Sequence, residues 1–191
     1  ISDESESECA IPEDIFDGTE GDADIDWGIQ LSLSLSLPGG DILTDTQNML
    51  GTAGDATDGC DPIYDVAELT DTPNYWTKLH FPHQDWDCAL VSGSKYNNDI
   101  RGIYEDLNEV KEWDVHLETN TWEGGGGIAT VSFYFYEEAG GNTAYYTVDD
   151  INYIRVNNGD QIEYGLINPV QSGSFKVIVG NIIPEAPIDL E

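Results

Sequence analysis

Carboxylate groups at short spacings are the side chains in this sequence best suited to chemistry. Asp58, Asp61 and Asp65 follow one another at intervals that one loop can gather. Calcium takes about six to eight oxygen ligands, which clustered carboxylates supply well. The segment therefore predicts a calcium site, with Gly59 letting the backbone turn. A solvated acidic loop, or Asp side chains that cap turns, is the alternative interpretation.

A second set of carboxylates, Asp22, Asp24 and Asp26, occupies every other position of an acidic segment. Alternate residues of an extended chain project to the same side, so these three also predict calcium binding. The segment is not an EF-hand loop, because the Gly and the Glu that such a loop needs are missing. A solvated segment is again the alternative.

Other reactive residue types form weaker patterns. His80 and His83 are separated by an odd interval, which on a strand places them on opposite faces. We therefore expect surface or turn positions for these two rather than zinc binding, and a packing role for His116. Carboxylate pairs arise by chance among thirty-eight acids, and the G-x-S-x-G, P-loop and H-E-x-x-H patterns are missing. We predict that the chain is not an enzyme.

Aromatic side chains offer flat faces on which sugar rings could stack. Packing within a core and across strands is the other use of such residues, and it is the one we expect here. Glycan binding stays open as an alternative. The residues concerned are Trp122, Tyr134, Tyr136, Tyr145, Tyr146 and Tyr153.

Strands are the elements that must position these residues. Leu alternates with Ser over residues 27–37, which is the period of a half-buried strand, and Pro38 begins the turn that ends it. Further strands are predicted where β-branched and aromatic runs alternate with turn residues. They cover residues 75–81, 113–119, 128–136, 143–148, 151–156, 161–166 and 174–179.

The connections complete the predicted fold. Residues 41–74 have the composition of a long acidic loop, a kind of loop that is usually functional or tied by a metal. The sequence NNGD at residues 157–160 is a strong hairpin signal, and one helical turn is predicted around residues 104–109. Many short strands with little helix predict an all-β fold, a single antiparallel β-sandwich of the Ig-like or jelly-roll-like kind.

The charge of the chain limits the kinds of partner that it can bind. Thirty-eight Asp and Glu against six Lys and Arg give a formal net charge of -32 over 191 residues. This argues against nucleic acid, which needs a basic surface, and no run of about 20 apolar residues predicts membrane insertion. The charge suits divalent cations, high salt or an extracellular setting. A hydrophobic content of 39% is enough for one core.

Two arms flank the predicted sandwich domain of residues 27–181. Residues 1–26 hold eleven acids and no base, a composition typical of a disordered tail. Residues 182–191 contain two prolines, which exclude a helix or a central strand. We predict that both extended arms bind neighbouring subunits; a strap on the chain's own domain is the alternative. The apolar residues for this contact are Ile11, Ile15, Phe16, Ile182, Ile183, Ile188 and Leu190.

The start of the chain and its cysteines bear on location. The sequence begins at Ile1 without Met or an apolar leader, which predicts an extracellular or cell-surface product after signal-peptide removal; a trimmed chain is the alternative. The odd number of cysteines, Cys9, Cys60 and Cys88, indicates one disulfide and one remaining thiol. Three pairings are open, and none has the spacing of a zinc site.

An ordered set of motifs resembles a known family. The motifs lie at residues 54–67 (GDATDGCDPIYDVA), 79–86 (LHFPHQDW), 98–101 (NDIR), 113–115 (WDV) and 175–180 (FKVIVG). Together they resemble a β-sandwich module of large secreted and cell-surface proteins of environmental bacteria, often those with type IX secretion. The match spans about residues 28–181. The resemblance implies a secreted sandwich for display or attachment, without catalytic residues.

The chain departs from that family in its cysteines and its size. The family usually has an aromatic where Cys60 stands, and no cysteine near Cys88. Cys60 lies inside the first matched motif and Cys88 follows the second, so we predict a Cys60–Cys88 disulfide worth roughly 2–4 kcal/mol. Cys9 would then link a neighbouring subunit or remain an unreacted thiol. The family module usually sits in a much larger protein, whereas a module with two arms resembles the subunit of an extracellular filament.

These expectations combine into one predicted function. The chain is expected to be a structural subunit that assembles with copies of itself, through its arms and with calcium bridging, into a helical extracellular or pilus-like filament. The alternative is a monomeric cell-surface module that binds calcium and carbohydrate.

Overall fold

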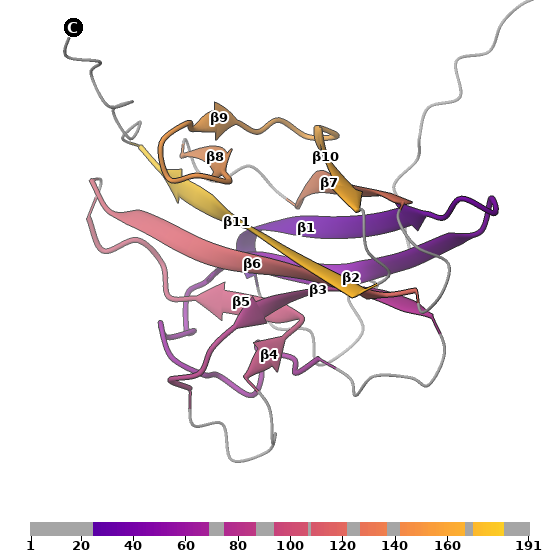
Figure 1. Cartoon of the computed structure of the whole chain (residues 1–191). Coiled ribbons are helices and arrows are strands. Elements are labelled where there is room, and N and C mark those ends of the chain that lie inside the picture. The colour runs from indigo at the N-terminus through magenta and orange to yellow at the C-terminus, as the bar shows by residue number, and fades with distance from the viewer. Residues whose placement is uncertain are drawn as a thin grey trace, which may run out of the picture.

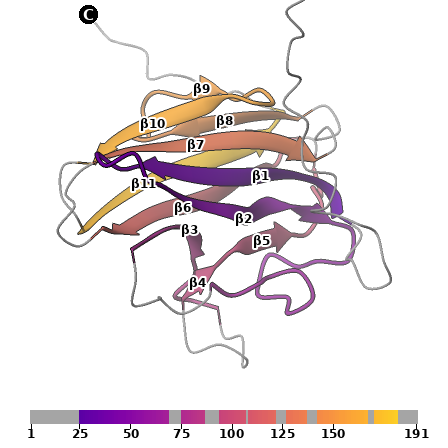
Figure 2. The same cartoon turned by 90° about the vertical axis from the view of Figure 1, so that its right-hand side faces the viewer.

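Two β-sheets packed face to face make up the part of the chain that the computed structural model describes (Figure 1). The described residues are 25–68, 75–86, 94–106, 108–121, 127–136, 142–166 and 170–181, and they contain no helix. The predicted all-β sandwich is confirmed. Figure 2 shows the long strands of both sheets running in a similar direction, as in aligned sandwiches.

The first sheet has five strands in the order β10-β7-β1-β2-β5. All neighbours are antiparallel except β2 and β5, which pair in parallel. The strands are β1 (Ile25–Ser36), β2 (Ile42–Ala53), β5 (Asn98–Arg101), β7 (Gly127–Tyr136) and β10 (Gln161–Leu166).

The second sheet has six strands in the order β4-β3-β6-β11-β8-β9, all antiparallel. The long strands β6 and β11 pair along their whole length at its centre. The strands are β3 (Trp76–Pro82), β4 (Lys95–Tyr96), β6 (Val110–Asn120), β8 (Thr143–Thr147), β9 (Ile154–Arg155) and β11 (Val170–Gly180).

The core follows from the alternation in β1. Leu31, Leu33 and Leu35 are fully buried, while the intervening Ser residues face outward. Since side chains alternate across a strand, one Leu row meets the inward row of the second sheet, where Val115 and Leu117 are equally buried. The strand prediction for residues 27–37 is therefore confirmed.

The structure corrects the prediction of a loop from residue 41 to residue 74. Residues 42–53 form β2, which pairs with β1 from end to end after a turn at Pro38. The polar sequence of β2 hides its strand character, because Asp45 faces inward and accepts a hydrogen bond from the Leu79 N–H of β3 at 2.7 Å. A bulge opposite Ser32 takes up the extra residue.

Two smaller expectations are also wrong. The turn at residues 157–160 forms, but it does not join a hairpin, because β9 pairs with β8 whereas β10 pairs with β7. It passes the chain from the second sheet to the first. The expected helical turn at residues 104–109 is a plain turn in its described residues, with the Glu109 N–H donating to the Asp106 carbonyl at 3.0 Å.

A second, smaller core lies outside the sandwich. Tyr64, in the loop after β2, packs with Met49 and Ala53 of β2 and Ile100 of β5 on the outer side of the first sheet. This loop therefore covers the β2–β5 end of that sheet. It also fixes the carboxylates that the sequence marks as metal ligands.

Candidate functional site

The predicted calcium loop is tied down by its own carboxylates. Asp65 is buried and accepts hydrogen bonds from the Asp61 N–H at 2.6 Å and from the Ile100 N–H of β5 at 3.0 Å. Asp61 accepts one from the Thr57 N–H. These contacts cap turns and fasten the loop to the sheet, as the alternative interpretation expects.

The other acids of the loop also have protein partners. Asp58 pairs with the Lys111 ammonium at 2.9 Å, and the Tyr64 hydroxyl donates to Asp55. Within the described residues, no three His, Cys, Asp or Glu side chains are grouped so as to hold a metal ion. Asp22 and Asp24 lie outside those residues. Calcium binding at either acidic cluster stays a prediction.

Burial changes the titration of the loop. Desolvation raises the pKa of Asp65 to about 6, with a further rise from the neighbouring Asp99 and Asp61 carboxylates. The two main-chain N–H donors act in the opposite direction but do not cancel the burial. The carboxylate that holds the loop against β5 therefore gains a proton in mildly acidic solution.

A buried polar network surrounds Asp99 of β5. The Asp99 carboxylate is 1% exposed and lies 2.7 Å from Nε2 of His83. Arg101 donates to it from Nε and from Nη2, both at 2.9 Å. Burial alone would raise the pKa of Asp99, but the hydrogen bonds from His83 and Arg101 hold it below its usual value.

Aromatic rings enclose this network. Trp86 stacks on His83 with ring centroids 3.5 Å apart, and Tyr96 meets both rings edge-on. Arg101 lies over the Trp113 ring, whose Nε1–H donates to the Asp99 carbonyl at 3.0 Å. With both oxygens of its carboxylate occupied and its backbone bound, Asp99 acts as a structural anchor between the two sheets.

The sequence pointed to these residues without predicting the network. His83, Asp99, Arg101 and Trp113 all lie in the motifs on which the family resemblance depends, and the fold brings those motifs together. The available signal was the unusual pairing of Asp and Arg in one short strand. The contact partners could not be derived from it, because His83 is 16 residues away from Asp99 along the chain.

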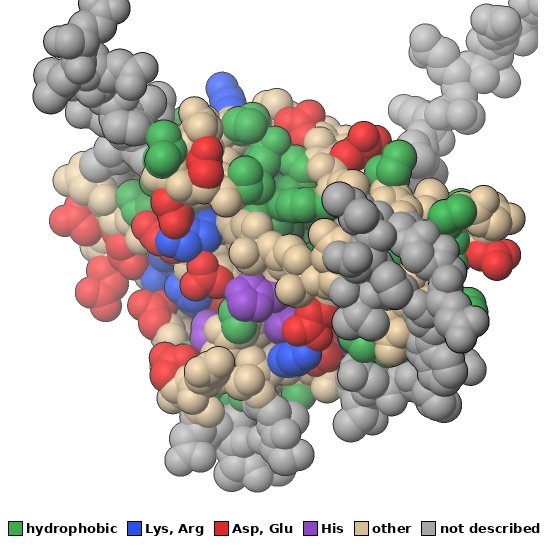
Figure 3. Space-filling view, viewed as in Figure 1, with side chains coloured by type: hydrophobic (Ala, Val, Ile, Leu, Met, Phe, Trp, Pro, Cys, Tyr) green, Lys and Arg blue, Asp and Glu red, His purple; other side chains and the backbone are tan. Residues whose placement is uncertain are grey.

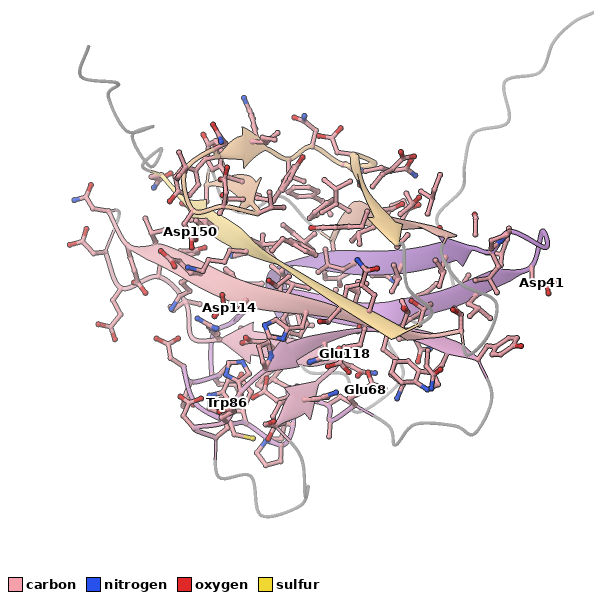
Figure 4. The ribbon with its side chains drawn as sticks, in the orientation of Figure 1. Asp41, Glu68, Trp86, Asp114, Glu118 and Asp150 are labelled. Carbon is pink, nitrogen blue, oxygen red and sulfur yellow. The ribbon has the colours of Figure 1, made fainter. Side chains whose placement is uncertain are left out.

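The outer face of the second sheet carries most of the basic residues. Lys78 pairs with Glu68 at 3.0 Å, Lys95 pairs with Glu118, and Lys176 pairs with Asp150 at 2.9 Å. Figure 3 shows these blue and red side chains on the face turned to the viewer, and Figure 4 labels their acidic members. The few basic side chains of the protein thus neutralise part of the carboxylate charge on this face.

The sequence predicted a surface or turn position for His80. The structure instead buries this residue, which is 2% exposed. Its ring lies 5.5 Å from the ring of His116, edge to face, on the neighbouring strand. Burial lowers the pKa of His80 to about 4, so the ring is neutral near neutral pH. The packing role expected for His116 is consistent with this contact.

The candidate sugar-stacking residues do not share one surface. Tyr134 and Tyr136 lie on β7 of the first sheet, whereas Tyr145 and Tyr146 lie on β8 of the second. Tyr146 stacks on Phe133 in the core with centroids 6.0 Å apart, which is the packing role expected from the sequence. Trp122 lies outside the described residues.

Several predicted residues fall outside the described parts of the chain. Cys60 is disulfide-bonded; Cys9 and Cys88 are both outside the described residues, so the Cys60–Cys88 pairing stays a prediction. The same holds for the apolar residues of the arms, Ile11, Ile15, Phe16, Ile182, Ile183, Ile188 and Leu190. In the described part there is no helix with the length and hydrophobicity needed to cross a membrane.

Sheet edges differ in how they are closed. The outer edge of β5 faces the loop after β2. This loop accepts a hydrogen bond from the Asn97 N–H at 2.7 Å and another from the Ile100 N–H. The edge of β4 is closed by a bridge between Ala67 and Tyr96. No described strand pairs with the outer edge of β10.

Comparisons with protein-family models, with curated proteins and with solved structures found no match to this chain.

Proposed function

We propose that the chain is a structural subunit of an extracellular filament, in which copies of the chain join by strand addition to the outer edge of β10. Among the described strands none pairs with the outer edge of β10, and this observation carries the proposal. An open edge is a row of hydrogen-bonding groups that another strand can satisfy.

The orientation of β10 can be followed from one hydrogen bond. The Phe133 N–H of β7 donates to the Asp160 carbonyl at 3.0 Å, and the paired residues continue in register along β10. Because main-chain groups alternate in direction along a strand, Ile162 and Tyr164 bond to β7. Gln161, Glu163 and Gly165 then direct their N–H and C=O groups to the outer edge.

Apolar side chains beside this edge favour an incoming strand. Tyr146 and Tyr164 are only partly buried against the core, and Ile154 of β9 is 50% exposed. Figure 3 shows hydrophobic side chains gathered around β8, β9 and β10, where the two sheets meet at their margins. A strand laid along β10 would cover part of this apolar surface and gain its burial energy.

The charge of the subunit is compatible with contact at the first sheet. The outward residues at the centre of this sheet are uncharged, and Ser34 has Thr44 and Thr130 as its lateral neighbours. Glu163 is the charged residue next in that row. Two copies of charge -32 therefore meet little repulsion at this sheet, and calcium would screen the rest.

Electron microscopy of the full chain tests the proposed function. We expect filaments of uniform width in negative stain, formed above a threshold concentration and favoured by calcium or high salt. Replacing Gly165 by Lys adds charge at the open edge and should abolish filaments, whereas Gly39→Lys, in the turn between β1 and β2, is the matched control. Isolated particles under all these conditions would contradict the proposal and favour a monomeric surface module.

A further inference from the structure

The identity of the incoming strand follows from prolines, side-chain pattern and chain length. We propose that residues 182–186 of a second copy pair as an antiparallel strand with the outer edge of β10. This inference rests on the filament function proposed above, and it names the donor segment and its register.

Proline sets the orientation of this segment. Pro lacks an N–H, so a paired strand tolerates it only where its nitrogen faces away from the partner. Pro184 must therefore face away from β10, which turns the N–H groups of Ile183 and Glu185 toward it. Pro187 is an odd number of residues farther on and would face β10, so pairing ends before it.

The same alternation divides the side chains into two rows. Ile182, Pro184 and Ala186 project to one side of the extended segment, and Ile183 and Glu185 project to the other. In β10 the inward row contains Ile162, which is 7% exposed, and the partly buried Tyr164. The wholly apolar row of the donor matches this inward side, next to the margin of the core.

Charge and strand length together select one register. Ile183 opposite Gly165 would place Glu185 opposite Glu163, and Ile183 opposite Gln161 would place Glu185 beyond the start of β10. The outward row of β10 is Gln161, Glu163 and Gly165, and a carboxylate placed opposite Glu163 would be unfavourable. An antiparallel strand with Ile183 opposite Glu163 places Glu185 opposite Gln161. In that register Ile183 and Glu163 direct their main-chain N–H and C=O groups toward each other. The orientation of Pro184, the apolar row and the separation of carboxylates are then satisfied together.

The chain's own tail cannot reach this position. β11 begins four residues after Leu166, close to the end of β10, and runs back past it, as Figure 1 shows. Its rise from Val170 to Gly180 is roughly 33 Å, against about 17 Å for β10, so Gly180 ends about 16 Å beyond Gln161. Extended residues span about 3.3 Å each. Within one chain, residues 182–186 would span the distance back to β10 and could not also pair with it. A second copy must therefore provide the strand that pairs.

Two proline variants of the full chain test the register. Glu185→Pro removes an N–H that faces β10, whereas Ala186→Pro changes a residue that faces away. We expect the concentration needed for polymerisation to rise roughly tenfold for the first, because interchain hydrogen bonds are lost, and little for the second. Glu185→Ala, which removes only the charge, should polymerise normally. Equal effects of the two proline variants would overturn the register.

Cross-linking tests the donor directly. Cysteines introduced by Ile183→Cys and Glu163→Cys should form a disulfide between copies, seen as a ladder on a non-reducing gel, whereas Ile183→Cys with Ser174→Cys should not. A bond within one chain would assign the tail to its own domain and overturn the proposal. Filaments that persist after deletion of residues 182–191 would overturn this inference alone. A full chain that never polymerises would contradict the proposed function itself.

Discussion

Nε2 of His83 lies 2.7 Å from the Asp99 carboxylate, which is 1% exposed between the two sheets. The contact joins the segment after β3 to β5, and Arg101 completes it from the same strand. A buried charge of this kind is stable only while its partners remain, since an unpaired ion in the interior is costly. The network therefore makes the fold depend on Asp99.

Asp99→Ala should lower the free energy of unfolding by about 3 kcal/mol, because Arg101 loses its buried counter-charge and His83 loses its hydrogen-bond partner. Asp85→Ala is the matched control, since the Asp85 side chain is 82% exposed and 3.8 Å from Nδ1 of the same histidine. Urea denaturation measures both. Similar losses of unfolding free energy for the two variants would show that the buried network contributes no more to stability than an exposed carboxylate does.

Between about pH 4 and pH 6, two groups should change the free energy of unfolding with pH in opposite directions. Asp65 has a folded pKa of about 6, above its unfolded value of 3.8, so its contribution falls as pH rises through this window. His80 has a folded pKa of about 4, below its unfolded value of 6.5, so its contribution rises. The two slopes partly cancel in the unmodified chain.

Single variants separate these slopes. Asp65→Asn removes the falling contribution, so its stability should rise with pH relative to the unmodified chain, and His80→Gln should show the reverse. Thermal unfolding at closely spaced pH values measures the difference. The explanation fails if both variants keep the pH profile of the unmodified chain.

Gly51 marks a close approach between β1 and β2. A Cβ at this position would lie 2.3 Å from the Trp27 carbonyl, so Gly51→Ala should destabilise the fold by about 2 kcal/mol. At Gly165, in β10, an added Cβ meets nothing within 4 Å, and Gly165→Ala should be neutral or slightly stabilising. Equal melting temperatures for the two variants would contradict this packing.

Calcium binding can be tested without reference to assembly. If the loop of Asp58, Asp61 and Asp65 binds calcium, about 1 mM calcium should raise the melting temperature and a chelator should reverse it. Asp58→Asn, which leaves the main-chain contacts of the loop in place, should remove the effect. An unchanged melting temperature would show that these carboxylates serve only as loop anchors.

Much of the sandwich could be predicted from local sequence, because β1, β6 and β7 alternate apolar and polar residues along their length. β2 escaped prediction because its inward row includes Asp45 and Asn48. Asn48 is fully buried, and Asp45 is half-buried where it accepts a hydrogen bond from β3; no local pattern reveals either environment.

The sites were predictable to a different degree. The Asp58, Asp61 and Asp65 cluster was visible in the sequence, but its hydrogen bonds to main-chain N–H groups depend on how the loop folds against β5. The position of β10 at the edge of the described sheet could not be predicted at all. Edge position depends on strand order, and here the turn at residues 157–160 changes sheets instead of closing a hairpin.

Hydrogen exchange of polymer and dispersed subunit tests the central claim most directly. Strand addition at β10 predicts that the amides of Gln161, Glu163 and Gly165 exchange quickly in the subunit and become protected in the filament. The amide of Ile100, already bound to Asp65, should exchange slowly in both forms. Filaments in which the outward amides of β10 exchange as fast as in the dispersed subunit would contradict the account.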